Sequence, residues 1–207
     1  MNEYNKKISN GFNVDYLGTE FMINTKFTGW KHITDKEDQK TLGDITDGSR
    51  CIDFKFDAYD NDNIVIEIKQ KCGYGWLDEL NDETIIMWVK TANGIISYAK
   101  VKDLKDFMQS LACKIRRPID VYTGTIIKNF RLAECLKYIK GFKTINVSEC
   151  DWWKNRPDIM KQSKPNTKEL YSNKWFWEAK RCCSKMTVEE YEEITGSKVS
   201  DIDIEDL

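Results

Sequence analysis

Residues 44–69, DITDGSRCIDFKFDAYDNDNIVIEIK, decide the fold. Apolar and polar residues alternate in CIDFKFD (51–57) and again in IVIEIK (64–69). A period of two predicts strands with one apolar face, and the DNDN turn between them predicts a hairpin. Because successive side chains of a strand point to opposite faces, the strands would place four charged residues on one face of that hairpin. These residues are Asp53, Lys55, Glu67 and Lys69, with Asp44 at the edge of the cluster.

The flanking sequence predicts the rest of a mixed sheet. Apolar residues recur at helical spacing over residues 13–26, and TIIMWVK (84–90) is typical of a strand buried on both faces. Asn93-Gly94 predicts a two-residue hairpin turn into residues 95–101, followed by a helix over 103–115. A helix over 131–139 and a strand over 142–147 come next. This order predicts an α/β (α+β) domain with a mixed central sheet flanked by helices.

Composition narrows the classes of protein. The 207 residues are 41% hydrophobic and 32% charged, which is typical of one globular domain. No apolar run approaches the roughly 20 residues that span a bilayer, and the first residues lack a secretory signal. The seven cysteines include no C-x-x-C pair, so we expect reduced packing residues. These features predict a cytoplasmic protein with no membrane partner, and the single histidine, His32, excludes histidine-based nuclease sites.

Clustered carboxylates and lysines on a strand face indicate a metal site. Asp44, Asp53 and Glu67 would repel one another at close range. Mg²⁺ prefers oxygen ligands and is commonly held by one or two carboxylates together with substrate phosphate oxygens. The ion lowers the pKa of an attacking water and stabilises charge on phosphoryl oxygens, and a neighbouring lysine can orient that water. The pattern therefore points to phosphodiester hydrolysis.

The spacing Asp44…Asp53-Phe54-Lys55 resembles the D…(D/E)xK signature of the PD-(D/E)XK nuclease superfamily, which includes restriction endonucleases and Holliday-junction resolvases. The surrounding sequence resembles small phage and bacterial nuclease-like proteins of that superfamily, over roughly residues 35–107. The shared features are Gln39, the strand at 52–55, the Ile-Glu-Ile strand at 66–68, the Gly-Trp step at 75–76, and a strand-turn-strand and helix ending near Met108. The resemblance implies a restriction-endonuclease-like fold with acids that bind Mg²⁺ or Mn²⁺ and a lysine that positions the water.

Two triads fit this signature. The first is Asp44, Asp53 and Lys55, with Gly43 where the family name has proline; the second is Asp53, Glu67 and Lys69. We favour the first because its surrounding residues match better. Glu67 would then be a third metal ligand beside Asp44 and Asp53, and Lys69 would support Lys55.

The resulting hypothesis is a metal-dependent nuclease that hydrolyses DNA phosphodiester bonds in a bacterial or phage-infected cell. A catalytically inactive nuclease-fold binding protein, such as a phage inhibitor of a host defence complex, is the alternative. A solvated strand face with cross-strand ion pairs is the simplest account of the same residues. A homodimer is compatible with the sequence.

The chain after the expected core domain (1–147) has a different character. Residues 148–207 form an expected C-terminal part packed on or beside the core. Nine Lys and Arg against four Asp and Glu, interleaved with tryptophans, occupy 151–185, and an acidic tail follows. Basic and aromatic residues together are typical of a nucleic-acid surface, so we expect Lys174, Lys180 and Arg181 to contact DNA. An amphipathic segment that packs its rings inward is the other interpretation.

Overall fold

The computed structural model describes residues 3–58, 61–70, 73–110, 113, 119–122 and 125–162, and within them the strands form two sheets. The larger sheet has six strands in the order β1-β2-β3-β6-β7-β10. All its neighbours are antiparallel except β3 and β6, which are parallel. Its strands are β1 (Lys31–His32), β2 (Ile45–Thr46), β3 (Cys51–Asp57), β6 (Ile85–Lys90), β7 (Ile95–Lys100) and β10 (Lys143–Asn146).

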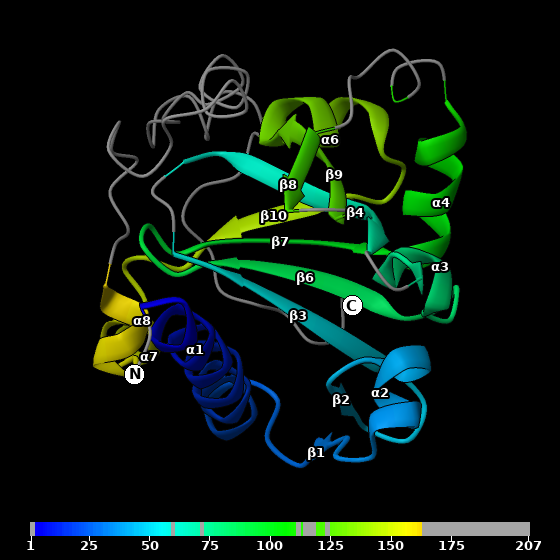
Figure 1. The fold of residues 1–207 in the computed structure, drawn as a ribbon. Coiled ribbons are helices and arrows are strands. Elements are labelled where there is room, and N and C mark those ends of the chain that lie inside the picture. The colour runs from blue at the N-terminus through cyan, green and yellow to red at the C-terminus, as the bar shows by residue number, and fades with distance from the viewer. Residues whose placement is uncertain are drawn as a thin grey trace.

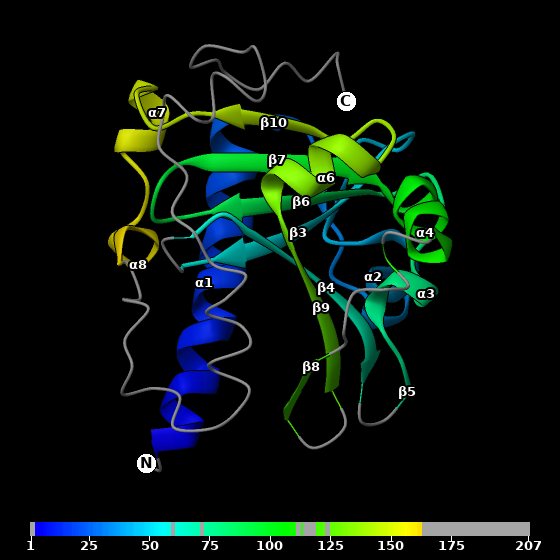
Figure 2. The same ribbon diagram turned by 90° about the horizontal axis from the view of Figure 1, so that it is seen from above.

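The smaller sheet has four antiparallel strands in the order β5-β4-β9-β8. Figure 2 shows β4 and β9 crossing over the strands of the larger sheet. The indole nitrogen of Trp88 on β6 donates to the backbone oxygen of Val65 on β4, at 3.2 Å, and so ties the two sheets together. The strands are β4 (Asn63–Gln70), β5 (Gly73–Tyr74), β8 (Ile119–Tyr122) and β9 (Thr125–Arg131).

Helices cover both faces of the larger sheet (Figure 1). On one face, α1 (Glu3–Thr25), α7 (Asp151–Lys154) and α8 (Asp158–Lys161) contribute Met22, Trp153 and Met160 to one hydrophobic cluster. On the other face, the smaller sheet packs with α3 (Trp76–Glu79), α4 (Val101–Gln109) and α6 (Leu132–Tyr138) around a second cluster. Helix α2 (Lys36–Leu42) lies between β1 and β2 in the chain. The predicted mixed sheet flanked by helices is confirmed.

Alternating residues explain why β3 lies between two layers. Ile52 and Phe54 are buried in the cluster beneath α1, so Asp53 and Lys55 point to the opposite face, toward α3 and the smaller sheet. Every residue of β6 is buried, as its continuous apolar run predicted. The sequence pattern therefore correctly placed Asp53 and Lys55 on one face of β3.

The predicted hairpin between residues 51–57 and 64–69 is wrong. Strand β3 pairs with β2 and β6, whereas β4 pairs with β5 and β9 in the other sheet. The turn residues between β3 and β4 suggested a local pairing, but β4 finds its partner about sixty residues later, in the strand TIIKNFR. Each of the two strands buries its apolar face against a different cluster, and this separates them.

The loop between β6 and β7 also differs from expectation. Lys90 pairs with Ile95, so the loop has the four residues 91–94 rather than two. Gly94 adopts φ 73° there, and an added Cβ would lie 2.8 Å from the backbone nitrogen of Ser148. Glycine is thus needed for both its conformation and its close contact with the chain that leads to α7.

The first part of the basic, aromatic C-terminal segment packs against α1 and the core. Trp153 is 1% exposed, and Trp152 stacks on Phe21 of α1 with ring centroids 5.7 Å apart. For these two tryptophans the packing interpretation therefore holds. In the part of the chain that the structure describes, no helix is long and apolar enough to cross a membrane.

Candidate active site

Asp44 is held against β3 by its backbone and by its side chain. Its amide donates to the Ile52 oxygen at 2.8 Å, and its Oδ2 accepts a 2.7 Å hydrogen bond from the Phe54 amide. Gly43 before it adopts φ 99°, and an added Cβ would lie 2.8 Å from the Asp53 Cβ. Proline is restricted to φ near −65° and cannot stand here. The backbone conformation and the close approach to Asp53 therefore require glycine at the position where the signature has proline.

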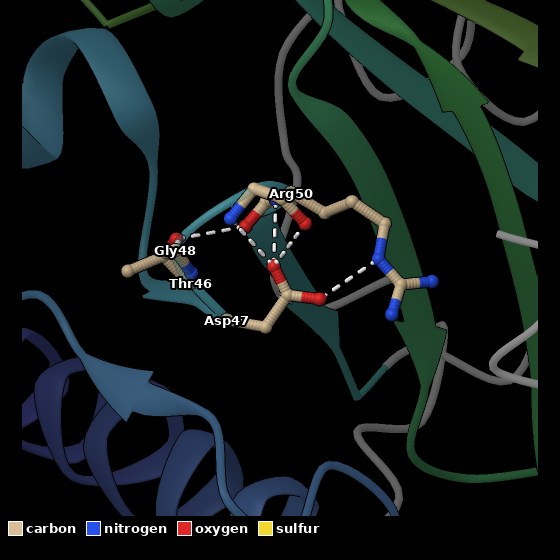
Figure 3. Close-up of polar contacts among 5 residues, drawn as sticks. Thr46, Asp47, Gly48 and Arg50 are labelled. Atoms are coloured by element: carbon tan, nitrogen blue, oxygen red, sulfur yellow. Dashed lines mark hydrogen bonds and ion pairs between the residues drawn. The ribbon is translucent and has the colours of Figure 1, made fainter.

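A tight turn between β2 and β3 supports this position (Figure 3). One carboxylate oxygen of Asp47 accepts from the amides of Ser49 and Arg50, at 2.8 and 2.7 Å, and the other accepts from Arg50 Nε at 2.9 Å. These hydrogen bonds, that of the Arg50 amide above all, hold the pKa of Asp47 well below its usual range. Asp47 is thus an acid of the turn, separate from the site.

Asp53 and Lys55 form an ion pair on the face of β3 that points away from α1. Asp53 is 7% exposed, and its Oδ2 lies 2.5 Å from Lys55 Nζ without the alignment of a hydrogen bond. Lys55 Nζ also lies 4.8 Å from the ring centroid of Trp76, the first residue of α3. The structure therefore brings together two carboxylates, one ammonium group and one indole ring.

The electrostatics of the carboxylate pair favour a cation. The pKa of Asp44 is raised to about 6. Burial is the larger cause of this rise, and the negative charge of Asp53 is the second. The hydrogen bond from Phe54 and the charge of Lys55 act in the other direction, without cancelling the rise. Two nearby carboxylates match the one or two with which Mg²⁺ is usually held. Asp44 and Asp53 thus fit a divalent cation in number, type and charge.

The structure does not join Glu67 to this group. Glu67 lies on β4, and its Oε1 is buried with no hydrogen-bond partner. Its backbone is close to α3, since a Cβ added at Gly75 would lie 2.6 Å from the Glu67 oxygen. Over the described residues, however, no three Asp, Glu, His or Cys side chains gather so as to hold a metal. The hairpin that was expected to bring Glu67 beside Asp53 does not form, because β3 and β4 belong to different sheets.

The remaining expected site residues are either outside the described part of the chain or have a structural role. The side chain of Lys69 lies outside the described part, as do Lys174, Lys180 and Arg181. Gln39 has a structural role, since its amide nitrogen donates to the Ile33 oxygen at 2.6 Å.

Two side-chain contacts near the site were not predicted from the sequence. Trp76 contacts Lys55, and no local pattern indicates that pairing. Lys90 is 2% exposed at the end of β6 and pairs with Asp57. The alternation of β3 places Asp57 on the same face as Asp53 and Lys55. The sequence does not show that its buried partner, Lys90, lies thirty-three residues away on another strand.

Comparison of the chain with protein-family models, with curated proteins and with solved structures finds no match. Membership of the PD-(D/E)XK superfamily therefore rests on Asp44 and the residues of β3 and stays a proposal.

The raised pKa of Asp44 predicts that this residue destabilises the fold at neutral pH. A carboxyl with a folded pKa of about 6 binds its proton more tightly than in the unfolded chain, so its stabilisation is fully present below pH 3.8 and is lost as pH rises through 6. Asp44→Asn keeps an acceptor for Phe54 but has no charge. Without divalent cations, we expect it to raise the free energy of unfolding by roughly 1–3 kcal/mol at pH 8, and much less at pH 4.

Urea denaturation at the two pH values measures this effect. Asp106→Asn, at an exposed position on α4, is the control and should change stability equally at both. A loss of stability in Asp44→Asn at pH 8 would contradict the prediction. It would show that neighbouring groups stabilise the charged Asp44 carboxylate in the folded protein.

Proposed function

We propose that this chain is a Mg²⁺- or Mn²⁺-dependent nuclease of the PD-(D/E)XK type that hydrolyses DNA phosphodiester bonds. The observation that carries the proposal is the placement of Asp44 beside Asp53, with the Lys55 ammonium 2.5 Å from the Asp53 carboxylate. These are the residues of the favoured triad. Their convergence in space is what the D…(D/E)xK resemblance requires.

Each member of the triad has a role that its surroundings support. Asp44 and Asp53 would hold the cation, with the Phe54 amide fixing one oxygen of Asp44. When bound, Mg²⁺ supplies stabilisation of the charge on the phosphoryl oxygens and lowers the pKa of an attacking water. Lys55 would orient that water and add positive charge, since its side chain is 30% exposed and open to solvent on one side. Glu67 and Lys69 stay candidates for supporting roles.

DNA as the substrate is supported by the resemblance and by the positive charge of residues 151–185. Phosphates approaching a carboxylate pair need nearby cations. Lys174, Lys180 and Arg181 are proposed for that role.

One observation favours the alternative function, an inactive nuclease fold that serves as a binding platform. No three Asp, Glu, His or Cys side chains of the described residues form a metal-binding group, and Lys55 already neutralises Asp53. A binding protein has no need of a metal, and such a pair could persist in it as a buried ionic contact.

A nuclease assay tests the proposal. We expect cleavage of supercoiled plasmid, linear duplex or single-stranded DNA with Mg²⁺ or Mn²⁺, and none with EDTA. RNA in parallel reactions tests the substrate class. Cleavage that persists in EDTA, or that Lys55→Ala leaves unchanged, would contradict the proposed mechanism. No cleavage of any substrate, together with no metal-induced rise in Tm, would favour the binding platform.

A further inference from the structure

The Lys55 ammonium contacts two groups that attract it. Asp53 Oδ2 lies 2.5 Å from it, and the centroid of the Trp76 ring lies 4.8 Å from it. The face of an indole ring attracts an ammonium group within about 6 Å of its centroid, more strongly than other aromatic rings do. Lys55 thus has a second interaction partner besides the Asp53 carboxylate.

Trp76 is positioned by elements other than β3. The approach of Gly75 to the Glu67 oxygen leaves no room for a side chain at residue 75, so the start of α3 lies directly against β4. Leu77 and Leu80, which follow in the chain, are 4% and 3% exposed and pack in the adjoining cluster. The ring therefore keeps its place whether or not Lys55 contacts Asp53.

This geometry matters because one carboxylate cannot neutralise two cations equally well. A divalent cation held by Asp44 and Asp53 would repel the ammonium, which lies 2.5 Å from the Asp53 carboxylate. Without another partner, a flexible lysine side chain would move into solvent, away from the site. The face of the Trp76 ring offers the ammonium a position that is still close to the site.

We propose that Trp76 is a positioning residue, which retains the Lys55 ammonium at the site when a divalent cation occupies Asp44 and Asp53. The inference rests on the proposed function and adds a residue to it. Trp76 touches neither the cation nor the phosphodiester and acts only through Lys55. Its loss should therefore lower kcat while leaving KM and cation affinity nearly unchanged.

NMR of the full-length protein labelled with ¹³C at lysine Cε tests the retention directly, with Lys55→Met to assign the resonance. Protons above an indole face shift upfield. We expect the Lys55 methylene protons to be shifted upfield both without metal and with saturating Mg²⁺. In Trp76→Leu they should take the values of an exposed lysine once Mg²⁺ is added, and Trp76→Phe should retain part of the shift.

The kinetic expectation is a fall in kcat of about 10–100-fold in Trp76→Leu and a much smaller fall in Trp76→Phe, at similar KM. Trp152→Leu is a matched control, because the Trp152 ring lies under Lys26 Nζ at the same 4.8 Å but packs against α1. That variant should lose its own lysine shift without a change in kcat.

The outcomes separate this inference from the proposed function. If Mg²⁺ raises the Tm of the unmodified protein but moves the Lys55 resonances to exposed values, Trp76 does not retain the lysine. Equal kcat in Trp76→Leu and the unmodified protein would overturn the inference in the same way. If Mg²⁺ leaves the Tm unchanged, the metal site fails, and the inference fails with it.

Discussion

Asp53→Asn should lower kcat/KM for DNA cleavage by about 10²–10³-fold or more and leave the protein folded. Asparagine has nearly the same shape as aspartate, so the 7% exposed position on β3 remains filled. It cannot supply the negative charge that the cation requires, and it leaves Lys55 without its carboxylate. Asp53 belongs to both triads that the sequence allows, so the expected loss does not depend on which of them is correct.

A melting experiment separates the loss of the metal site from the loss of the fold. Millimolar Mg²⁺ or Mn²⁺ should raise the Tm of the unmodified protein by mass action, because the folded state alone holds the carboxylates together. Asp53→Asn should show no such rise, whereas the exposed control Asp106→Asn should show it in full. A metal-induced rise that survives Asp53→Asn would place the cation elsewhere on the chain.

Local pattern was sufficient for β3 because the information needed lies within seven residues. The alternation of CIDFKFD requires Asp53 and Lys55 to share the face opposite Ile52 and Phe54, whatever the strand pairs with. The upstream acid was also predictable, since a short turn returns the chain to the neighbouring strand. The core of the proposed site is therefore a product of short-range sequence.

The position of Glu67 could not be predicted in the same way. Its own alternation on β4 was read correctly as a strand, but a strand's partner depends on which apolar faces match across the whole chain. Ile64 and Ile66 are buried with residues of α4, α6 and β9, and none of those contacts is visible in the local sequence. The β-branched residues at 119, 121 and 125–127, with a Thr-Gly dipeptide between them in the sequence, were the signals that could have revealed the second sheet.

No local sequence pattern indicates that Trp76 contacts Lys55. It requires α3 to approach β4 at Gly75 and, at the same time, to face β3 across the space between the sheets. The large apolar area of a tryptophan favours burial, as at Trp88 and Trp30, but it does not show that a partly buried ring contacts a lysine.

Asp57→Ala should destabilise the protein by about 3–5 kcal/mol, as expected when one partner of a buried ion pair is removed. Lys90 is 2% exposed, with its Nζ 2.6 Å from Asp57 Oδ2 and 3.1 Å from Asn61 Oδ1. The two charged residues are register partners at the ends of β3 and β6, the one parallel pairing among the described strands of the larger sheet. Without Asp57, the ammonium would stay buried with only a neutral amide as its partner.

A double-mutant cycle shows whether this cost comes from the unpaired charge. Lys90→Met should be less costly than Asp57→Ala, because the remaining Asp57 side chain is 23% exposed and can be hydrated. The double variant should likewise be more stable than Asp57→Ala alone, because no buried charge is left without a partner. Urea denaturation of the four proteins measures the cycle. Additive losses would show that Asp57 and Lys90 act independently, and that packing rather than their charges joins the ends of β3 and β6.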